Sequence, residues 1–236
     1  MEKGIFVTGS DTGVGKTVVA GAIAAAIKEQ GLDVGVMKPV STGAKVIGRK
    51  LVSEDAMYLK KIIGCTDDDD LVNPIRLSPA SAPTLAATET GITLDLDKVW
   101  DAFKQLRSKH EFVVVEGIGG LMVPVDDNHL VADMILKMDL AIVVASKHSL
   151  GSINHTLLTV ECAKNRNIRV KGIIINMLRD GKEFVEEIRK FSSVPVLGTI
   201  PFKEDVNVGN CTFGDIVEHF RRDVNISRIM RKDITE

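Results

Sequence analysis

A glycine-rich loop between a strand pattern and a helix pattern restricts the fold of this chain more than any other feature. The segment Gly9–Thr17 reads GSDTGVGKT, and it lies between the apolar run Gly4–Thr8 and the Ala-, Val- and Ile-rich segment Lys16–Gln30. Glycines let backbone N–H groups surround phosphate oxygens, and the start of a helix adds positive partial charge. The segment therefore predicts a phosphate-binding loop in which Lys16 reaches the β- and γ-phosphates and Thr17 ligates Mg²⁺.

The rest of the chain alternates between short apolar runs and helical patterns. Runs without polar interruption, such as Phe112–Val115, are typical of parallel strands that helices cover on both faces. The expected strands are Gly4–Thr8, Val34–Met37, Phe112–Val115, Leu140–Val144, Gly172–Ile175 and Val196–Ile200. The expected helices are Lys16–Gln30, Asp55–Ile63, Asp95–Ser108 and Gly151–Asn165. We expect one domain, residues 1–236, with a doubly wound α/β fold whose mostly parallel sheet carries helices on both faces.

Three segments do not follow this alternation. Gly43–Gly48 and Asp67–Pro83 have loop composition. The second segment begins with four consecutive acidic residues, which cannot all face one ion, so we expect a solvated loop or a helix start there. The tail Val224–Glu236 combines apolar with basic residues, and its pattern favours a short docked helix.

Charge and cysteine content limit the partners and the compartment. The chain has 30 Lys and Arg against 32 Asp and Glu, so we expect no nucleic-acid or membrane partner. No apolar run approaches the roughly 20 residues that a membrane span requires. The three cysteines form no C-x-x-C pair, which favours a reducing, cytoplasmic setting.

A second acidic element follows one of the expected buried strands. Glu116 directly follows Phe112–Val115, and three glycines occur in the next four positions. The carboxyl end of a strand beside the loop strand lies close to the phosphates. Glu116 is therefore a candidate Mg²⁺ ligand, because Mg²⁺ prefers oxygen ligands. The histidines form no metal-binding spacing, and we expect them on the surface or in packed positions.

The order of the motifs resembles the dethiobiotin synthase family of P-loop NTPases. The loop Thr8–Thr17 is similar to the elongated loop of that family, with five residues between its first and third glycines, one more than the common form. Further matching segments follow in family order, and they are Lys38–Gly43, Asp55, Glu116–Gly120, Leu150–His155, Asn176 and Ile200–Pro201. Thr84 stands where the family commonly carries His.

The resemblance implies a reaction in biotin biosynthesis. In this family, 7,8-diaminononanoate, CO₂ and ATP give dethiobiotin, ADP and phosphate. One amine takes up CO₂ as a carbamate, the carbamate attacks the γ-phosphate, and the second amine closes the ureido ring. ATP is the co-substrate and Mg²⁺ the cofactor.

The resemblance also implies residue roles. The implied catalytic cations are Lys16 and Lys38. The implied nucleotide-binding residues are Gly13, Val14, Gly15, Lys16, Thr17, Val18, Asp55, Glu116, Gly117, Ile118, Gly119, Asn176, Pro201, Phe202 and Lys203. The implied substrate-binding residues are Thr12, Lys38, Thr42, Gly151, Ser152 and Asn154, and the implied Mg²⁺ ligands are Thr17, Asp55 and Glu116.

The resemblance also implies a quaternary structure, through the helix that begins near Gly151. In the family, the partner subunit supplies this helix start to hold the substrate carboxylate, which implies a homodimer with interface active sites. The sequence supports equally well an ordinary helix N-cap at Ser152 or Asn154.

Two other functions use a similar loop. Amide ligases of the cobyrinate diamide synthase type usually carry an additional glutaminase domain, and the chain after Lys203 is too short for one. Partitioning ATPases place an extra lysine early in the loop, whereas Ser10, Asp11 and Thr12 stand there in this chain. Both alternatives are less favoured than the synthase.

Overall fold

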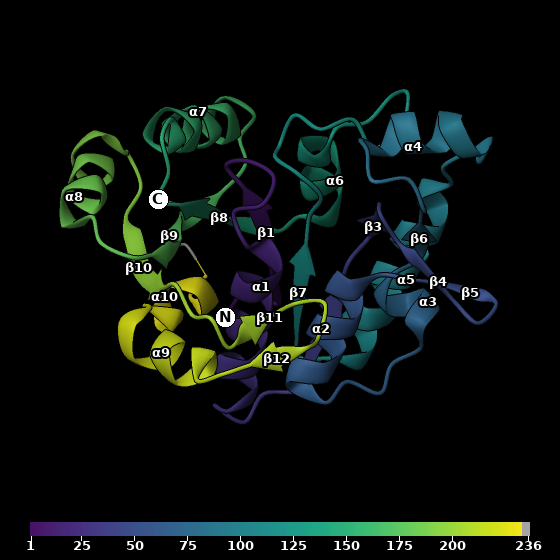
Figure 1. Ribbon diagram of the computed structural model, residues 1–236, viewed down its shortest axis with the longest axis horizontal. Helices are drawn as coiled ribbons and strands as arrows, with labels where there is room; N and C mark the ends of the chain where they lie inside the picture. Colours follow the sequence, from purple (N-terminus) through teal and green to yellow (C-terminus); the bar gives the residue numbers. More distant parts are fainter. Residues whose placement is uncertain (233–236) are drawn as a thin grey trace.

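A six-stranded parallel sheet forms the centre of the molecule in a computed structural model, which describes residues 1–232 (Figure 1). The strand order is β10-β9-β8-β1-β7-β2. The strands are β1 (Gly4–Gly9), β2 (Val34–Met37), β7 (Phe112–Glu116), β8 (Ala141–Lys147), β9 (Val170–Leu178) and β10 (Val196–Pro201). The loop strand β1 therefore lies between β7 and β8, at the point where the chain order of the strands reverses, and ligands bind at such points in open α/β sheets.

Helices cover both faces of the sheet because its side chains alternate between two cores. Ile5 and Val7 of β1 face one core, and Phe6 faces the other. The first core contains residues from α1 (Lys16–Lys28), α2 (Glu54–Ile63), α9 (Ile216–Asp223) and α10 (Ile226–Met230). The second contains residues from α4 (Pro83–Thr90), α5 (Leu96–Lys109), α6 (Val131–Met138), α7 (Ser152–Asn165) and α8 (Lys182–Phe191). The doubly wound α/β prediction is confirmed. Within residues 1–232, no helix combines the length and apolar character that a membrane crossing requires.

Every strand and helix predicted from the sequence is present, with ends that differ by a few residues. The tail prediction is confirmed for the part that the structure describes, since Ile229 of α10 is fully buried; residues 233–236 lie outside the described residues. Helices α4, α6, α8 and α9 were not predicted.

The two segments with loop composition contain regular structure. Gly43–Gly48 is largely one arm of an antiparallel hairpin formed by β4 (Lys45–Ile47) and β5 (Lys50–Val52). Asp67–Pro83 contains the short helix α3 (Asp69–Val72) and β6 (Ile75–Arg76), which pairs with β3 (Val40–Ser41). The C-terminal part adds the small pair β11 (Val206–Asn207) and β12 (Thr212–Phe213).

The acidic run is a helix start, as expected, with Asp68–Asp70 exposed at the beginning of α3, and the buried Asp67 is its one exception. Its carboxylate pairs with Lys109 and lies 2.7 Å from Nε2 of His110, whose Nδ1 lies 3.0 Å from Asp33. Burial raises the pKa of Asp67, but hydrogen bonds with Lys109 and His110 outweigh burial and hold this pKa below its ordinary value. The ion pair with Lys109 and the contact with His110 explain why Asp67, unlike its acidic neighbours, is buried.

We expect Asp67→Asn to lower the free energy of unfolding by about 2 kcal/mol at pH 7, because the buried pair loses its negative charge. A carboxylate with a depressed folded-state pKa stabilises the fold above its unfolded pKa, and this contribution disappears as pH falls through the folded-state value. Urea unfolding should therefore show a difference at pH 7 that shrinks in acid. The neighbouring exposed Asp68 provides the control, and an equal loss in Asp68→Asn would contradict the assignment.

Candidate active site

The phosphate loop connects β1 to α1 at the carboxyl end of the sheet (Figure 1). Gly15 has φ 82°, and a Cβ there would lie 2.0 Å from Nδ2 of Asn176. The same Nδ2 donates to the carbonyl of Val14 at 3.0 Å. Asn176 thus packs directly on the loop, and Gly15 is required both for its left-handed backbone and for this close approach.

Lys16 lies inside the loop with its side chain 8% exposed. Its ammonium donates to the backbone carbonyl of Asp11 at 3.2 Å. Burial, and then the positive charge of Lys38, lowers the pKa of Lys16 to about 8. An anionic ligand in the loop would offset both effects, so the loop favours a phosphate group next to this ammonium.

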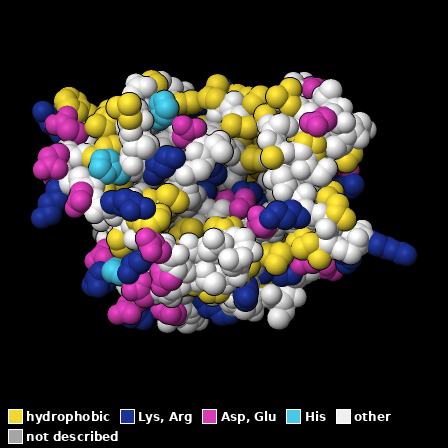
Figure 2. Space-filling view, viewed as in Figure 1, with side chains coloured by type: hydrophobic (Ala, Val, Ile, Leu, Met, Phe, Trp, Pro, Cys, Tyr) yellow, Lys and Arg dark blue, Asp and Glu magenta, His cyan; other side chains and the backbone are white. Residues whose placement is uncertain are grey.

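Four side chains from separate elements meet beside the loop. Lys38, directly after β2, places Nζ 2.7 Å from Oε1 of Glu116 and 2.8 Å from Oδ2 of Asp55 in α2. Oγ1 of Thr17 donates to the same Oε1 of Glu116 at 2.8 Å. The cluster gathers there because β1, β2 and β7 are neighbours that end at one edge of the sheet. Figure 2 shows acidic and basic side chains together in the hollow near the middle of this face.

Lys38 and Asp55 stabilise each other's charge, whereas burial raises the pKa of Glu116 despite the nearby charge of Lys38. Burial alone would lower the pKa of Lys38, but the charges of Glu116 and Asp55 outweigh burial and hold this pKa above its ordinary range. For Asp55, burial raises the pKa, and Lys38 together with Thr17 brings the pKa below its ordinary value. Lys38 is therefore a buried cation, 3% exposed, at physiological pH.

Buried hydrogen bonds fix the backbone of Lys38. Its N–H donates to the carbonyl of Val72 at 2.7 Å, and its carbonyl accepts from Nδ2 of Asn73 at 2.6 Å. Oδ1 of Asn73 accepts from the Ser41 hydroxyl at 2.9 Å. Asn73 is 2% exposed and was not predicted as a site residue. No local sequence pattern indicates it, since Lys38 and Asn73 meet only in the folded chain.

The cluster fits a magnesium ion bound together with a triphosphate. Thr17, Asp55 and Glu116 offer a hydroxyl and two carboxylates, the oxygen ligands that Mg²⁺ prefers. Oε2 of Glu116 is buried and has no hydrogen-bond partner among the described residues. Residues 1–232 contain no group of three or more His, Cys, Asp or Glu that could hold a metal by themselves. Phosphate oxygens and water would have to supply the remaining ligands.

The loop after β7 lies against the phosphate loop. Gly119 accepts a hydrogen bond from the N–H of Gly9 at 3.3 Å, and Gly117 donates to Val7 at 3.0 Å. The carbonyl of Gly117 also accepts from Nζ of Lys38 at 3.1 Å. The expected residues Gly117–Gly119 therefore lie next to the phosphate loop, with Ile118 partly exposed between the two glycines.

The residues expected at the nucleotide base lie near the end of β9 and β10. Asn176 is in β9, and Pro201 ends β10. Phe202 is 37% exposed, and the guanidinium of Arg179 lies 3.8 Å from its ring centroid. Lys203 pairs with Asp215 at 3.0 Å. The structure brings Asn176 to the loop, and the ion pair with Asp215 holds Lys203 next to Phe202.

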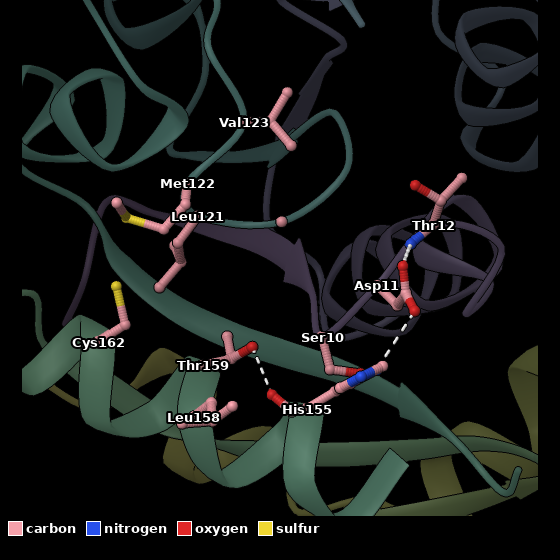
Figure 3. A pocket seen from close by; sticks show the side chains of 11 residues that line it. Ser10, Asp11, Thr12, Leu121, Met122, Val123, His155, Leu158, Thr159 and Cys162 are labelled. Carbon is pink, nitrogen blue, oxygen red and sulfur yellow. Dashed lines mark hydrogen bonds and ion pairs between the residues drawn. The ribbon is translucent and has the colours of Figure 1, made fainter. Parts of the chain in front are cut away.

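A cavity of about 600 Å³ opens beside the tip of the phosphate loop (Figure 3). Its size is within the usual range for small-molecule sites. The lining residues are Ser10, Asp11, Thr12, Gly120, Leu121, Met122, Val123, His155, Leu158, Thr159 and Cys162. Thr12 was expected at the substrate and lines this cavity. The other lining residues, including the half-exposed His155, were not predicted as site residues.

Gly151, Ser152 and Asn154 at the start of α7 lie next to this cavity but do not line it, whereas His155 of the same turn does. Gly151 is the N-cap, with φ 83° and no side-chain cap, so the N-cap interpretation of Ser152 or Asn154 is wrong. The hydroxyl of Ser152 is 2.6 Å from that of Ser149 and is buried. Thr42 directly follows β3 and is partly exposed.

The fold and the loop define a P-loop nucleotide-binding protein, and residues 3–208 match the family described as AAA domain. The chain belongs to the dethiobiotin synthetase family. It is 39% identical over 214 residues to the ATP-dependent dethiobiotin synthetase BioD of Methanocaldococcus jannaschii, covering 86% of this chain and 96% of the relative. It is 38% identical over 239 residues to the BioD of Bacillus licheniformis, covering 98% and 97% of the two chains.

Solved structures with the same fold include two proteins of other function. The MinD cell division protein of Aquifex aeolicus has a TM-score of 0.60 at 12% identity and covers 99% of both chains. A ParA family ATPase from Chlorobium tepidum has a TM-score of 0.56 at 17% identity and covers 92% of both. At these identities the likeness shows the fold alone.

Proposed function

We propose that this chain catalyses the ATP-dependent synthesis of dethiobiotin from 7,8-diaminononanoate and CO₂. The observation that carries this proposal is the buried cluster of Lys38, Asp55, Glu116 and Thr17 beside the loop lysine Lys16. Lys16 and Lys38, the two cations expected to act in catalysis, thus lie at the same edge of the sheet. The terminal phosphate of ATP would meet a second substrate at this edge. The family of the chain supports the same reaction.

The reaction requires three bonds to form in order. An amine of the substrate adds to CO₂ and loses a proton, which gives a carbamate. A carbamate oxygen attacks the γ-phosphorus, and ADP leaves. The second amine then attacks the carbonyl carbon of this mixed anhydride, loses a proton and displaces phosphate, which closes the ureido ring.

The protein contributes position and charge to these steps. Phosphoryl transfer depends mainly on alignment and charge neutralisation. Lys16 would bind the β- and γ-phosphates, and Lys38 would hold the carbamate against the γ-phosphate from a site that is nearly closed to water. Thr17, Asp55 and Glu116 would hold Mg²⁺, which neutralises phosphate charge when bound. Gly13–Val18 and Gly117–Gly119 would surround the phosphates, and Asn176, Pro201, Phe202 and Lys203 would form the base region.

The cavity beside the loop would receive the carbon chain of the diamine. Leu121, Met122, Val123 and Leu158 provide an apolar wall, and Thr12 lies at the end next to the phosphate loop. Burial of an alkyl chain contributes roughly 0.8 kcal/mol for each CH₂ group. The cavity therefore suits a substrate whose reactive amines sit at one end of an aliphatic chain, and the partly exposed Thr42 would also contact this substrate.

The purified chain, incubated with 7,8-diaminononanoate, bicarbonate, Mg²⁺ and ATP, should produce dethiobiotin that mass spectrometry detects. ADP and dethiobiotin should appear in equal amounts. Omission of the diamine provides the control, since ATP hydrolysis should then nearly stop. Hydrolysis without cyclic urea would instead favour the nucleotide-switched ATPase that the MinD and ParA folds exemplify.

We also propose a cytoplasmic homodimer. Leu150 is fully exposed, and Met122 and Leu158 are 53% and 60% exposed, so apolar side chains gather around the cavity and the start of α7. A second copy would cover them, and its Gly151, Ser152 and Asn154 would then approach the carboxylate of the substrate. Free Cys65, Cys162 and Cys211 support the reducing compartment.

Leu158→Glu should shift the protein from dimer to monomer, because the charge would be buried in the interface. Light scattering coupled to size-exclusion chromatography measures the mass. Phe191→Glu on α8, where the wild-type side chain is also 60% exposed, is the matched control and should remain dimeric. A wild-type protein that is monomeric at micromolar concentration would refute the proposed dimer.

A further inference from the structure

A carboxylate and an imidazole form a pair at the polar end of the cavity. Oδ2 of Asp11 lies 3.3 Å from Nδ1 of His155, and Oδ1 of Asp11 accepts the N–H of Thr12 at 2.7 Å. Asp11 belongs to the phosphate loop and His155 to the first turn of α7. The pair therefore joins two walls of the cavity, and both side chains point toward it (Figure 3).

The charge of this cavity selects for a cationic ligand. Among the described residues that line it, Asp11 is the one acidic residue, and none is Lys or Arg. Lys16 donates to the backbone carbonyl of Asp11, so the Asp11 carboxylate is not neutralised by that contact. An apolar cavity that ends in a carboxylate suits an alkyl chain with an amino group.

The pair contributes little to folding by itself. Asp11 and His155 are 56% and 47% exposed, and ion pairs between exposed groups are weak. Its consequence is geometric, because the imidazole fixes Oδ2 of a carboxylate whose Oδ1 already accepts the N–H of Thr12. A change at His155 should then affect the ligand of Asp11 without unfolding the protein.

We propose that His155 is a positioning residue that holds the Asp11 carboxylate, and that this carboxylate binds the amine of the diamine that carries no carbamate. The inference rests on the proposed function and refines it. Asp11 would hold the second amine next to the phosphate loop, where the mixed anhydride forms. The pair thus distinguishes a diamine from an alkylamine with a single nitrogen.

Steady-state kinetics of three variants test this role. His155→Leu removes the N–H donor, whereas His155→Asn keeps an N–H near the position of Nδ1. We expect His155→Leu to raise KM for the diamine about 10-fold, as for the loss of one charge-assisted hydrogen bond. KM for ATP and the thermal midpoint should stay unchanged, and His155→Asn should recover most of the diamine affinity. Asp11→Asn should raise KM for the diamine at least as much.

His129→Leu is the matched control, because His129 forms a similar half-exposed pair with Asp126, 2.9 Å away, outside this cavity. Inhibition by 8-aminononanoate adds a second readout. This single amine should bind wild type more weakly than the diamine does, and Asp11→Asn should remove the difference. If His155→Leu raises KM for ATP as much as KM for the diamine, or if His155→Asn recovers nothing, the inference is wrong. Failure of wild type to make dethiobiotin would refute the proposed function instead.

Discussion

Lys38→Met should reduce kcat by about 10²- to 10³-fold while ATP still binds. The change removes a cation that would stabilise negative charge between the carbamate and the γ-phosphate. In a nearly water-free site, such an interaction lowers the activation barrier by roughly 3–4 kcal/mol. Methionine keeps a similar side-chain volume, so the surrounding packing should persist. Quench-flow measurement of ADP formation together with calorimetric ATP titration separates the chemical step from binding.

The buried carboxylates require a control for this experiment. Asp55 and Glu116 lose their common partner in Lys38→Met, and an unpaired buried charge destabilises a fold. Thermal unfolding therefore has to show that the variant is folded at the assay temperature. Lys45→Met, a change of an exposed lysine in the nearby hairpin, should have no effect on kcat. A Lys38→Met rate within tenfold of wild type would exclude the assigned role.

Lys16→Met should weaken ATP binding by about 100-fold and also reduce turnover by 10³-fold or more. The ammonium would contact the phosphates in both the ground state and the transition state, so both measurements respond. Burial already disfavours its charge, as the lowered pKa of about 8 indicates, and a bound triphosphate would restore the lost stabilisation. Calorimetry with Mg²⁺ and ATP gives the affinity, and single-turnover assays at saturating ATP give the rate.

The two lysine variants are expected to differ in kind. Lys38→Met should lose rate at nearly constant ATP affinity, whereas Lys16→Met should lose both. ATP affinity close to that of wild type in Lys16→Met would show that Gly9–Thr17 does not bind phosphate as proposed. Equal loss of ATP affinity in both variants would instead show that Lys38 acts mainly in nucleotide binding.

The parts of the site that the sequence predicts are those placed by strand order. Lys38 and Glu116 each follow an apolar run, and parallel strands bring such positions to one edge of the sheet. Gly15 and Lys16 belong to a contiguous loop, so their spacing is visible in the sequence. Local pattern and fold class were sufficient to predict Gly15, Lys16 and Glu116, whereas the role of Lys38 was implied by the resemblance to the dethiobiotin synthase family.

The parts that were missed depend on contacts between distant segments. Asn73 reaches the backbone of Lys38 only because α3 packs beside the end of β2. His155 meets Asp11 only because α7 crosses the tip of the phosphate loop. Asp67 is buried because Lys109 and His110, at the end of α5, contact its carboxylate. The sequence spacing within these pairs gives no sign that their members meet, so each residue resembles an ordinary surface residue in the sequence.

The fate of a CO₂ oxygen tests most directly whether Lys16 and Lys38 bring a carbamate against the γ-phosphate. Wild-type protein would receive oxygen-18-labelled CO₂, the diamine, Mg²⁺ and unlabelled ATP in unlabelled water, and the reaction would be stopped before the label exchanges with the solvent. If a carbamate oxygen attacks phosphorus, the released phosphate should carry one oxygen-18 atom for each dethiobiotin formed. Unlabelled phosphate alongside full formation of dethiobiotin would contradict this account.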